Sequence, residues 1–130
     1  MIATLLDRLP GLADASMRRM AKAVGRLHLE VRRFNELRPG TLVDLYERYF
    51  RQRDFRVDLF ALAVGADSGG RLGRDAEGDR LAHQVEADLT WLRERCEAVD
   101  AAHLREQFGA NTDAFKAALH ERRAAALRTR

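Results

Sequence analysis

Apolar residues recur at helical spacing through two long segments of this chain, and this periodicity limits the fold more than any other feature. The first seam consists of Met17, Met20, Val24, Leu27, Val31 and Phe34. The second consists of Leu81, Val85, Leu89, Leu92, Cys96 and Val99. At 100° per residue, the first seam covers an arc of about 100°, which is one face of a helix. Each seam predicts a helix that buries this face in a core, although the first could also serve a coiled-coil interface.

The composition favours the same fold class. Leu and Ala dominate the apolar residues, whereas the β-branched residues Ile and Val are few. Leu and Ala favour helix over sheet. A length of 130 residues fits one domain with one core. We therefore predict an all-α fold with residues 1–130 as a single helical domain, a small helical bundle of four main helices plus one or two short ones.

Capping and breaking residues predict where the helices begin and end. The expected helices cover residues 2–9, from Asp14 or Ser16 to about Leu37, 42–52, 54–64, 79–99, 100–108 and from Asn111 or Thr112 into the C-terminal region. Thr41, Asp100 and Asn111 are residue types that cap helix N-termini. Gly109 suits a helix C-terminus. The alternation of Phe55, Val57 and Leu59 would also suit a strand.

Two segments are predicted to lie outside the helices. Residues 65–78 contain five Gly and read as a flexible connection between helices. Residues 122–130 hold four Arg and no acid, and they read as a basic C-terminal tail.

Charge is unevenly distributed along the chain. Residues 18–56 hold ten Arg and one Lys against five acids, whereas residues 57–121 hold seven bases against thirteen acids. On the first long helix, the basic side chains occupy an arc of about 140° opposite the apolar seam. Clustered positive charge can bind a polyanion. The alternative is that acids of residues 75–106, or of another subunit, pair with these bases.

Aromatic and Arg residues alternate in the segment 46–56. Aromatic rings can stack on exposed bases while Arg binds phosphates, as in single-strand binding proteins. The other interpretation buries the rings of Tyr46, Tyr49 and Phe50 and leaves the Arg side chains exposed. The Arg residues can contact phosphates under either interpretation.

No motif in the sequence identifies a reaction. The four His residues lack metal-binding spacing, and there is no Cys pair for zinc. The Gly-rich segment is not followed by Gly-Lys-Ser/Thr, so it is not a P-loop. Cys96 lies in an apolar seam and reads as a core residue. We therefore expect no cofactor, no metal, no catalytic residue and no enzyme activity. A single Cys and the absence of a long apolar run predict a cytoplasmic protein without a membrane partner.

The charge pattern leads to a functional hypothesis. The chain is predicted to be a non-enzymatic module that binds the backbone of DNA or RNA, as a small subunit of a larger nucleoprotein assembly. The predicted nucleic-acid-binding residues are Arg18, Arg19, Lys22, Arg26, Arg33, Arg48, Arg51, Arg53 and Arg56. The alternative is a protein-interaction module (an adaptor, inhibitor or chaperone) that uses its opposed basic and acidic surfaces for protein partners or self-association.

Overall fold

The computed structural model describes residues 15–52, 55–69 and 75–129, and every regular element in these ranges is helical. The elements are α2 (Ala15–Arg32), η1 (Phe34–Glu36), α3 (Pro39–Leu45), η2 (Tyr46–Phe50), α4 (Val57–Gly69), α5 (Asp75–Glu97), α6 (Ala101–Phe108) and α7 (Thr112–Ala126). η1 is a 3₁₀ turn and η2 is a π-helical turn. The all-α prediction is confirmed, and the alternative strand near Phe55 is a coil followed by α4. The helix predicted for residues 2–9 lies outside the described residues.

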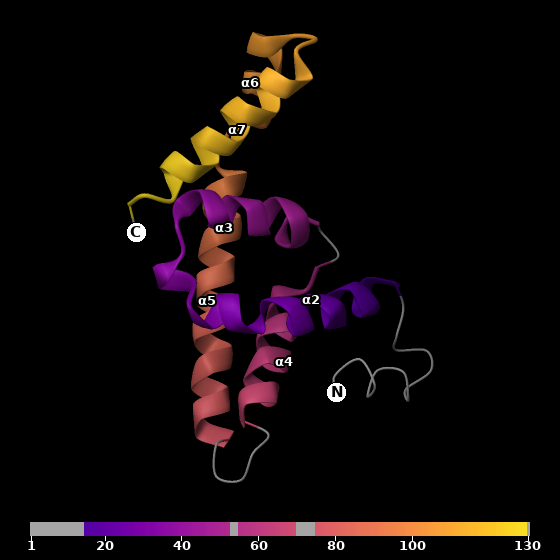
Figure 1. The fold of residues 1–130 in the computed structure, drawn as a ribbon, viewed down its shortest axis with the longest axis vertical. Coiled ribbons are helices and arrows are strands. Elements are labelled where there is room, and N and C mark those ends of the chain that lie inside the picture. Colours follow the sequence, from indigo (N-terminus) through magenta and orange to yellow (C-terminus); the bar gives the residue numbers. More distant parts are fainter. Residues whose placement is uncertain (1–14, 53–54, 70–74, 130) are drawn as a thin grey trace.

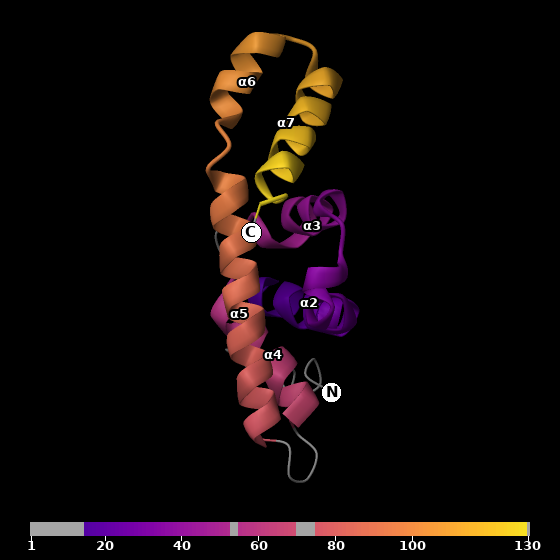
Figure 2. The ribbon, with the colours of Figure 1, turned by 90° about the vertical axis from the view of Figure 1, so that its left-hand side faces the viewer.

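α5 runs along the long axis of the molecule. α2, α3 and α4 lie alongside it, whereas α6 and α7 lie beyond its C-terminal end (Figure 1). α4 packs antiparallel to its first half, while α2 and α3 cross it steeply (Figure 2). Both predicted seams are core over most of their length: Val24, Val85 and Leu89 are almost completely buried, whereas Leu81 and Val99 are half-buried. Met17 is the one seam residue whose side chain is not described.

The α4–α5 contact depends on a glycine. Gly65 is buried in α4, and a Cβ atom built on it would collide with the Gly78 carbonyl oxygen of α5. The same atom would lie 2.9 Å from the Ala82 Cβ. The predicted connection at 65–78 is therefore too long: α4 continues to Gly69 and α5 begins at Asp75. Gly65 thus lies within a helix and allows α4 and α5 to approach closely, instead of belonging to a connection.

The segment between α2 and α3 differs from the prediction at both of its ends, and Pro39 explains the second. A residue before proline is restricted to extended conformations, and Arg38 has φ −70° and ψ 151°. α2 ends at Arg32 instead of continuing to about Leu37: Arg33, with φ −107° and ψ 24°, departs from helical geometry, and η1 leads into the turn. Proline is favourable in the first helical turn, so α3 begins at Pro39. The prediction that Thr41 caps this helix is wrong.

α6 and α7 form a hairpin beyond the C-terminal end of α5 (Figure 2). Its predicted caps are confirmed: the Asp100 side chain accepts a hydrogen bond from the His103 N–H, and Asn111 accepts one from the Ala114 N–H. Gly109 ends α6 with φ 53°, a conformation that favours glycine. α7 then returns to pack on α3. The predicted basic tail at 122–130 is thus helical as far as Ala126, with Arg123 buried.

Candidate nucleic-acid interface

A groove between α2 and the end of η2 brings four basic side chains together. It has a volume of about 240 Å³. Its lining residues are Arg19, Lys22, Ala23, Arg26, Arg48, Tyr49, Gln52 and Phe55. Four of these eight carry positive charge, and no acidic residue lines the groove within the described parts of the chain. The site is therefore suited to an anion.

The α2 side of the groove follows from helical spacing. Arg19, Lys22 and Arg26 lie three and four residues apart, so they project from one face along about two turns of helix. All three are exposed, whereas Ala23 between them is buried at the base of the groove. The neighbouring seam residue Val24 lies on the opposite face of α2 and anchors the helix on the core. The seam thus fixes where the basic side chains project.

The opposite side of the groove is formed by residues of the π-helical turn η2 and of the segment that follows it. The Arg51 N–H donates to the Tyr46 carbonyl oxygen at 2.8 Å, which spans five residues instead of four. A π turn accommodates one extra residue, and such turns are frequent at functional sites. Tyr46 and Phe50 are both buried, while Arg48 is exposed. The intervening Tyr49 is half-buried and lines the groove.

Aromatic rings form the floor of the groove. Phe55 is buried and packs edge-on against Phe50, with ring centroids 5.1 Å apart. Tyr49 lies 6.2 Å from the same Phe50 ring. The interpretation that buries the rings is confirmed for Tyr46 and Phe50. Tyr49 is half-buried and lines the groove, and stacking on a base stays a prediction.

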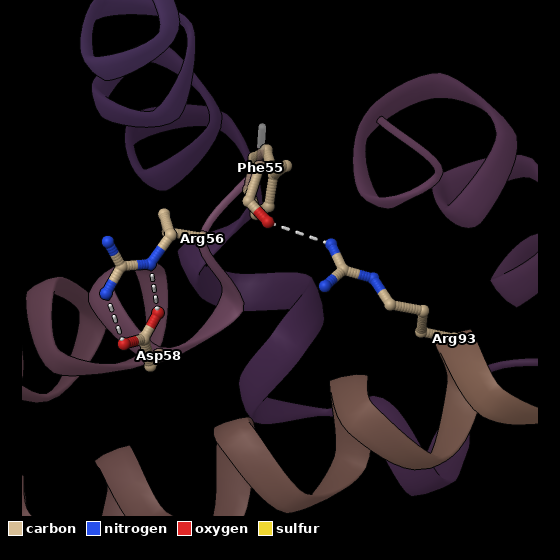
Figure 3. A network of polar contacts seen from close by, with 4 residues as sticks. All are labelled: Phe55, Arg56, Asp58 and Arg93. Atoms are coloured by element: carbon tan, nitrogen blue, oxygen red, sulfur yellow. Dashed lines mark hydrogen bonds and ion pairs between the residues drawn. The ribbon is translucent and has the colours of Figure 1, made fainter. Parts of the chain in front are cut away.

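Arg93 of α5 holds the turn that carries this floor. Its guanidinium donates to the carbonyl oxygens of Phe50 and Phe55, with N···O distances of 2.9 Å for Nη2 to each. Figure 3 shows Arg93 reaching Phe55 across the space between the helices. Sequence reasoning missed Arg93, because its partners are backbone atoms about 40 residues away.

The remaining predicted binding residues lie around or away from the groove. Arg18 and Arg51 are exposed but do not line it. Arg33 is paired with Glu36 at 2.8 Å, and Arg56 is paired with Asp58 at 2.8 Å (Figure 3). Arg53 lies outside the described residues. Gln52 was not predicted, and no pattern in the sequence marks it as a groove residue.

Internal pairing does not neutralise the whole groove. Within the described ranges, Lys22, Arg26 and Arg48 make no side-chain hydrogen bond or ion pair. Arg33 and Arg56 pair with acids two or three residues away, each by a hydrogen bond that raises the pKa of the guanidinium. Their acidic partners, Glu36 and Asp58, therefore lie within or next to the basic segment 18–56, and not among residues 75–106.

A second cavity of about 370 Å³ lies where α5 meets the α6–α7 hairpin. It is lined by Ala98, Val99, Asp100, His103, Leu104, Arg122, Ala125 and Ala126. Asp100 is already engaged as a helix cap, and Arg122 is the one Arg or Lys in the lining. This cavity lacks the concentrated positive charge of the groove. No group of three or more potential metal ligands occurs in the described part of the chain.

Comparison with known proteins gives two curated relatives. The chain is 38% identical, over 96% of its length, to a multifunctional CCA protein of Methylococcus capsulatus. It is 38% identical, over 73% of its length, to a multifunctional CCA protein of Halorhodospira halophila. The chain spans only 28% and 22% of the lengths of these relatives. No protein-family model matches the chain, and no solved structure matches it significantly.

These similarities correct the predicted function. Both relatives are named multifunctional CCA protein, which is the name of an enzyme. The predictions of a non-enzymatic module and of a chain without enzyme activity are therefore wrong, because they relied on the absence of a recognisable motif. The relatives' name is compatible with a nucleic-acid partner. No described helix is long and apolar enough to cross a membrane.

Proposed function

We propose that this chain takes part in the tRNA nucleotidyltransferase activity of its relatives, and that the α2–η2 groove binds the tRNA substrate. The observation that carries the proposal is the convergence of Arg19, Lys22, Arg26 and Arg48 on one groove. We choose RNA as the partner because both relatives carry the name of a protein that acts on tRNA. Arg and Lys bind phosphate through charge-assisted hydrogen bonds. Because phosphates carry no base identity, these contacts hold the RNA without selecting its sequence.

The charge distribution supports this role. The groove lies in the basic region of the chain, and Lys22, Arg26 and Arg48 lack described partners that would have to be displaced. Four phosphate contacts would give a fall of log affinity with log salt concentration at a slope of about −3 to −4. The acidic residues of α5 would disfavour RNA elsewhere on the molecule, because like charges repel.

Fluorescence anisotropy with a labelled tRNA tests the proposal. The variant Arg26→Glu with Arg48→Glu should weaken binding by about tenfold or more and reduce the salt slope by about 2. Both side chains are exposed, so the variant should keep the helical circular dichroism of the wild type.

The matched control is Arg80→Glu with Arg128→Glu. Both residues are exposed and lie outside the groove, and the change in net charge is the same. This control should retain most of the wild-type affinity. Undiminished tRNA binding by the folded groove variant, or an equal loss in the control, would contradict the proposal.

A further inference from the structure

The groove has two different surfaces, and phosphate binding uses only one of them. The basic side chains are exposed and stand at its rim, whereas Ala23 and Phe55 are buried at its base. Tyr49 is half-buried and forms part of the wall. A groove for backbone phosphates alone needs no apolar aromatic floor. Ala23 and Phe55 also belong to the core, but Tyr49 is only half-buried, so part of its ring is available to a planar ligand.

The size of the groove limits what can enter. Pockets for drug-sized ligands measure about 300–1,000 Å³, and this groove measures about 240 Å³. A single planar ring system is the appropriate size. Nucleobases are planar and stack on aromatic side chains, and every base offers such a face.

The polar groups fit the same ligand. Gln52 lines the groove and is exposed, and its amide both donates and accepts hydrogen bonds, as a base edge requires. The cations at the rim would hold the flanking phosphates. A base in a duplex is stacked and paired, so only an unpaired base could reach the floor.

We propose that the α2–η2 groove binds a single unstacked RNA nucleotide, with its base against Tyr49 and Phe55 and its phosphates on Lys22, Arg26 and Arg48. This inference rests on the proposed function, because it takes RNA as the partner. It adds that the groove distinguishes an unpaired nucleotide from paired RNA. An acidic peptide would use the cations but not the aromatic floor.

The first experiment changes the RNA and leaves the protein intact. Two RNA duplexes would be compared by anisotropy, one fully paired and one with a single bulged nucleotide. A third duplex would carry an abasic site at the bulge, which keeps the phosphate but removes the base. Since base–aromatic stacking increases affinity by about 5- to 150-fold, the bulged duplex should bind about tenfold more tightly. The other two should bind alike, and equal affinities for all three would overturn the inference.

The second experiment changes Tyr49. Tyr49→Leu should remove most of the preference for the bulged duplex while leaving the affinity for the paired duplex unchanged. Tyr49→Phe keeps the aromatic face and should retain the preference. A 2-aminopurine at the bulge should be quenched alike by the wild type and by Tyr49→Phe, and clearly less by Tyr49→Leu, which keeps only Phe55. Undiminished quenching in Tyr49→Leu would overturn the assignment of this ring.

The outcomes separate the two proposals. If the Arg26→Glu and Arg48→Glu variant loses tRNA binding but the bulge confers no advantage, the groove binds phosphate alone and only this inference fails. If that variant binds tRNA normally, the proposed function fails. If an acidic peptide competes with tRNA while the bulge confers no advantage, the groove recognises negative charge instead of a nucleotide.

Discussion

The Arg93 side chain closes the turn after η2 by donating two hydrogen bonds to the Phe50 carbonyl oxygen, from Nε at 3.1 Å and from Nη2 at 2.9 Å. A third hydrogen bond runs from Nη2 to the Phe55 carbonyl oxygen, at 2.9 Å. One planar guanidinium thus connects α5 to both ends of the segment 50–55. This segment carries Gln52 and ends in Phe55, both of which line the groove.

Replacing Arg93 should destabilise the protein and loosen the groove. Hydrogen bonds from charged donors contribute about 1.5–3 kcal/mol, so Arg93→Met should lower the free energy of unfolding by about 2–3 kcal/mol. Arg93→Lys should recover only part of this loss, because an ammonium cannot reproduce the planar fork. Urea denaturation measures the effect. Arg80→Met, on the exposed face of α5, is the matched control and should change stability by less than about 0.5 kcal/mol.

Cys96 should be chemically inert in the folded protein. It is fully buried, and burial raises the pKa of its thiol to about 12. Only the thiolate reacts with disulfide reagents, so labelling at about pH 8 should proceed only after unfolding in denaturant. The stabilisation linked to the protonated thiol is complete below the unfolded-state pKa and declines as the pH rises towards 12. Rapid labelling under native conditions would contradict the burial of Cys96.

Arg123 of α7 should be a major stabilising residue of the contact between α7 and η2. It is 7% exposed, donates to the Glu47 carboxylate at 3.2 Å and lies 5.0 Å from the centroid of the Tyr46 ring. Arg123→Met would leave Glu47 without its cation. Removing one partner of a fully buried pair costs about 3–5 kcal/mol, and the part-exposed Glu47 reduces the expected loss to about 2–3 kcal/mol.

A second substitution identifies the cause of that loss. Arg123→Met combined with Glu47→Gln removes both charges and should regain much of the stability. Arg122→Met, at the exposed neighbouring position, should change stability by less than about 0.5 kcal/mol. Thermal denaturation followed by circular dichroism compares the three variants. A double variant as unstable as Arg123→Met would show that packing against Tyr46, and not charge pairing, accounts for the effect.

The buried helix faces and several helix ends could be predicted from the sequence. The seams from Met20 to Phe34 and from Val85 to Cys96 identify buried faces, because helical periodicity is a property of neighbouring residues. Asp100, Asn111 and Gly109 identify helix ends for the same reason. The basic side chains of the groove also belong to the predicted set, since three of them share one helix face.

Long-range contacts were not predictable. The groove forms because η2 lies beside α2 in the fold. Arg93 supports it by donating hydrogen bonds to backbone carbonyl oxygens about 40 residues away in the chain. The π turn has no composition signal that separates it from an ordinary helix containing Tyr46 and Phe50. The enzyme relationship came from similarity to other proteins and not from any motif within these residues.

Gly65 provides the sharpest test of the packing between α4 and α5. Gly→Ala in a helix normally stabilises a protein, because glycine is destabilising there by about 0.5–1 kcal/mol. At Gly65 the sign should reverse: the new methyl group would meet the Gly78 carbonyl oxygen and lie 2.9 Å from the Ala82 Cβ. Overpacking of this kind costs about 1–3 kcal/mol. The matched control is Gly25→Ala on α2, where an added Cβ meets nothing within 4 Å and the substitution should be stabilising. Urea denaturation of the two variants should therefore give midpoint shifts of opposite sign, and a stabilising Gly65→Ala would show that the two helices do not pack this closely.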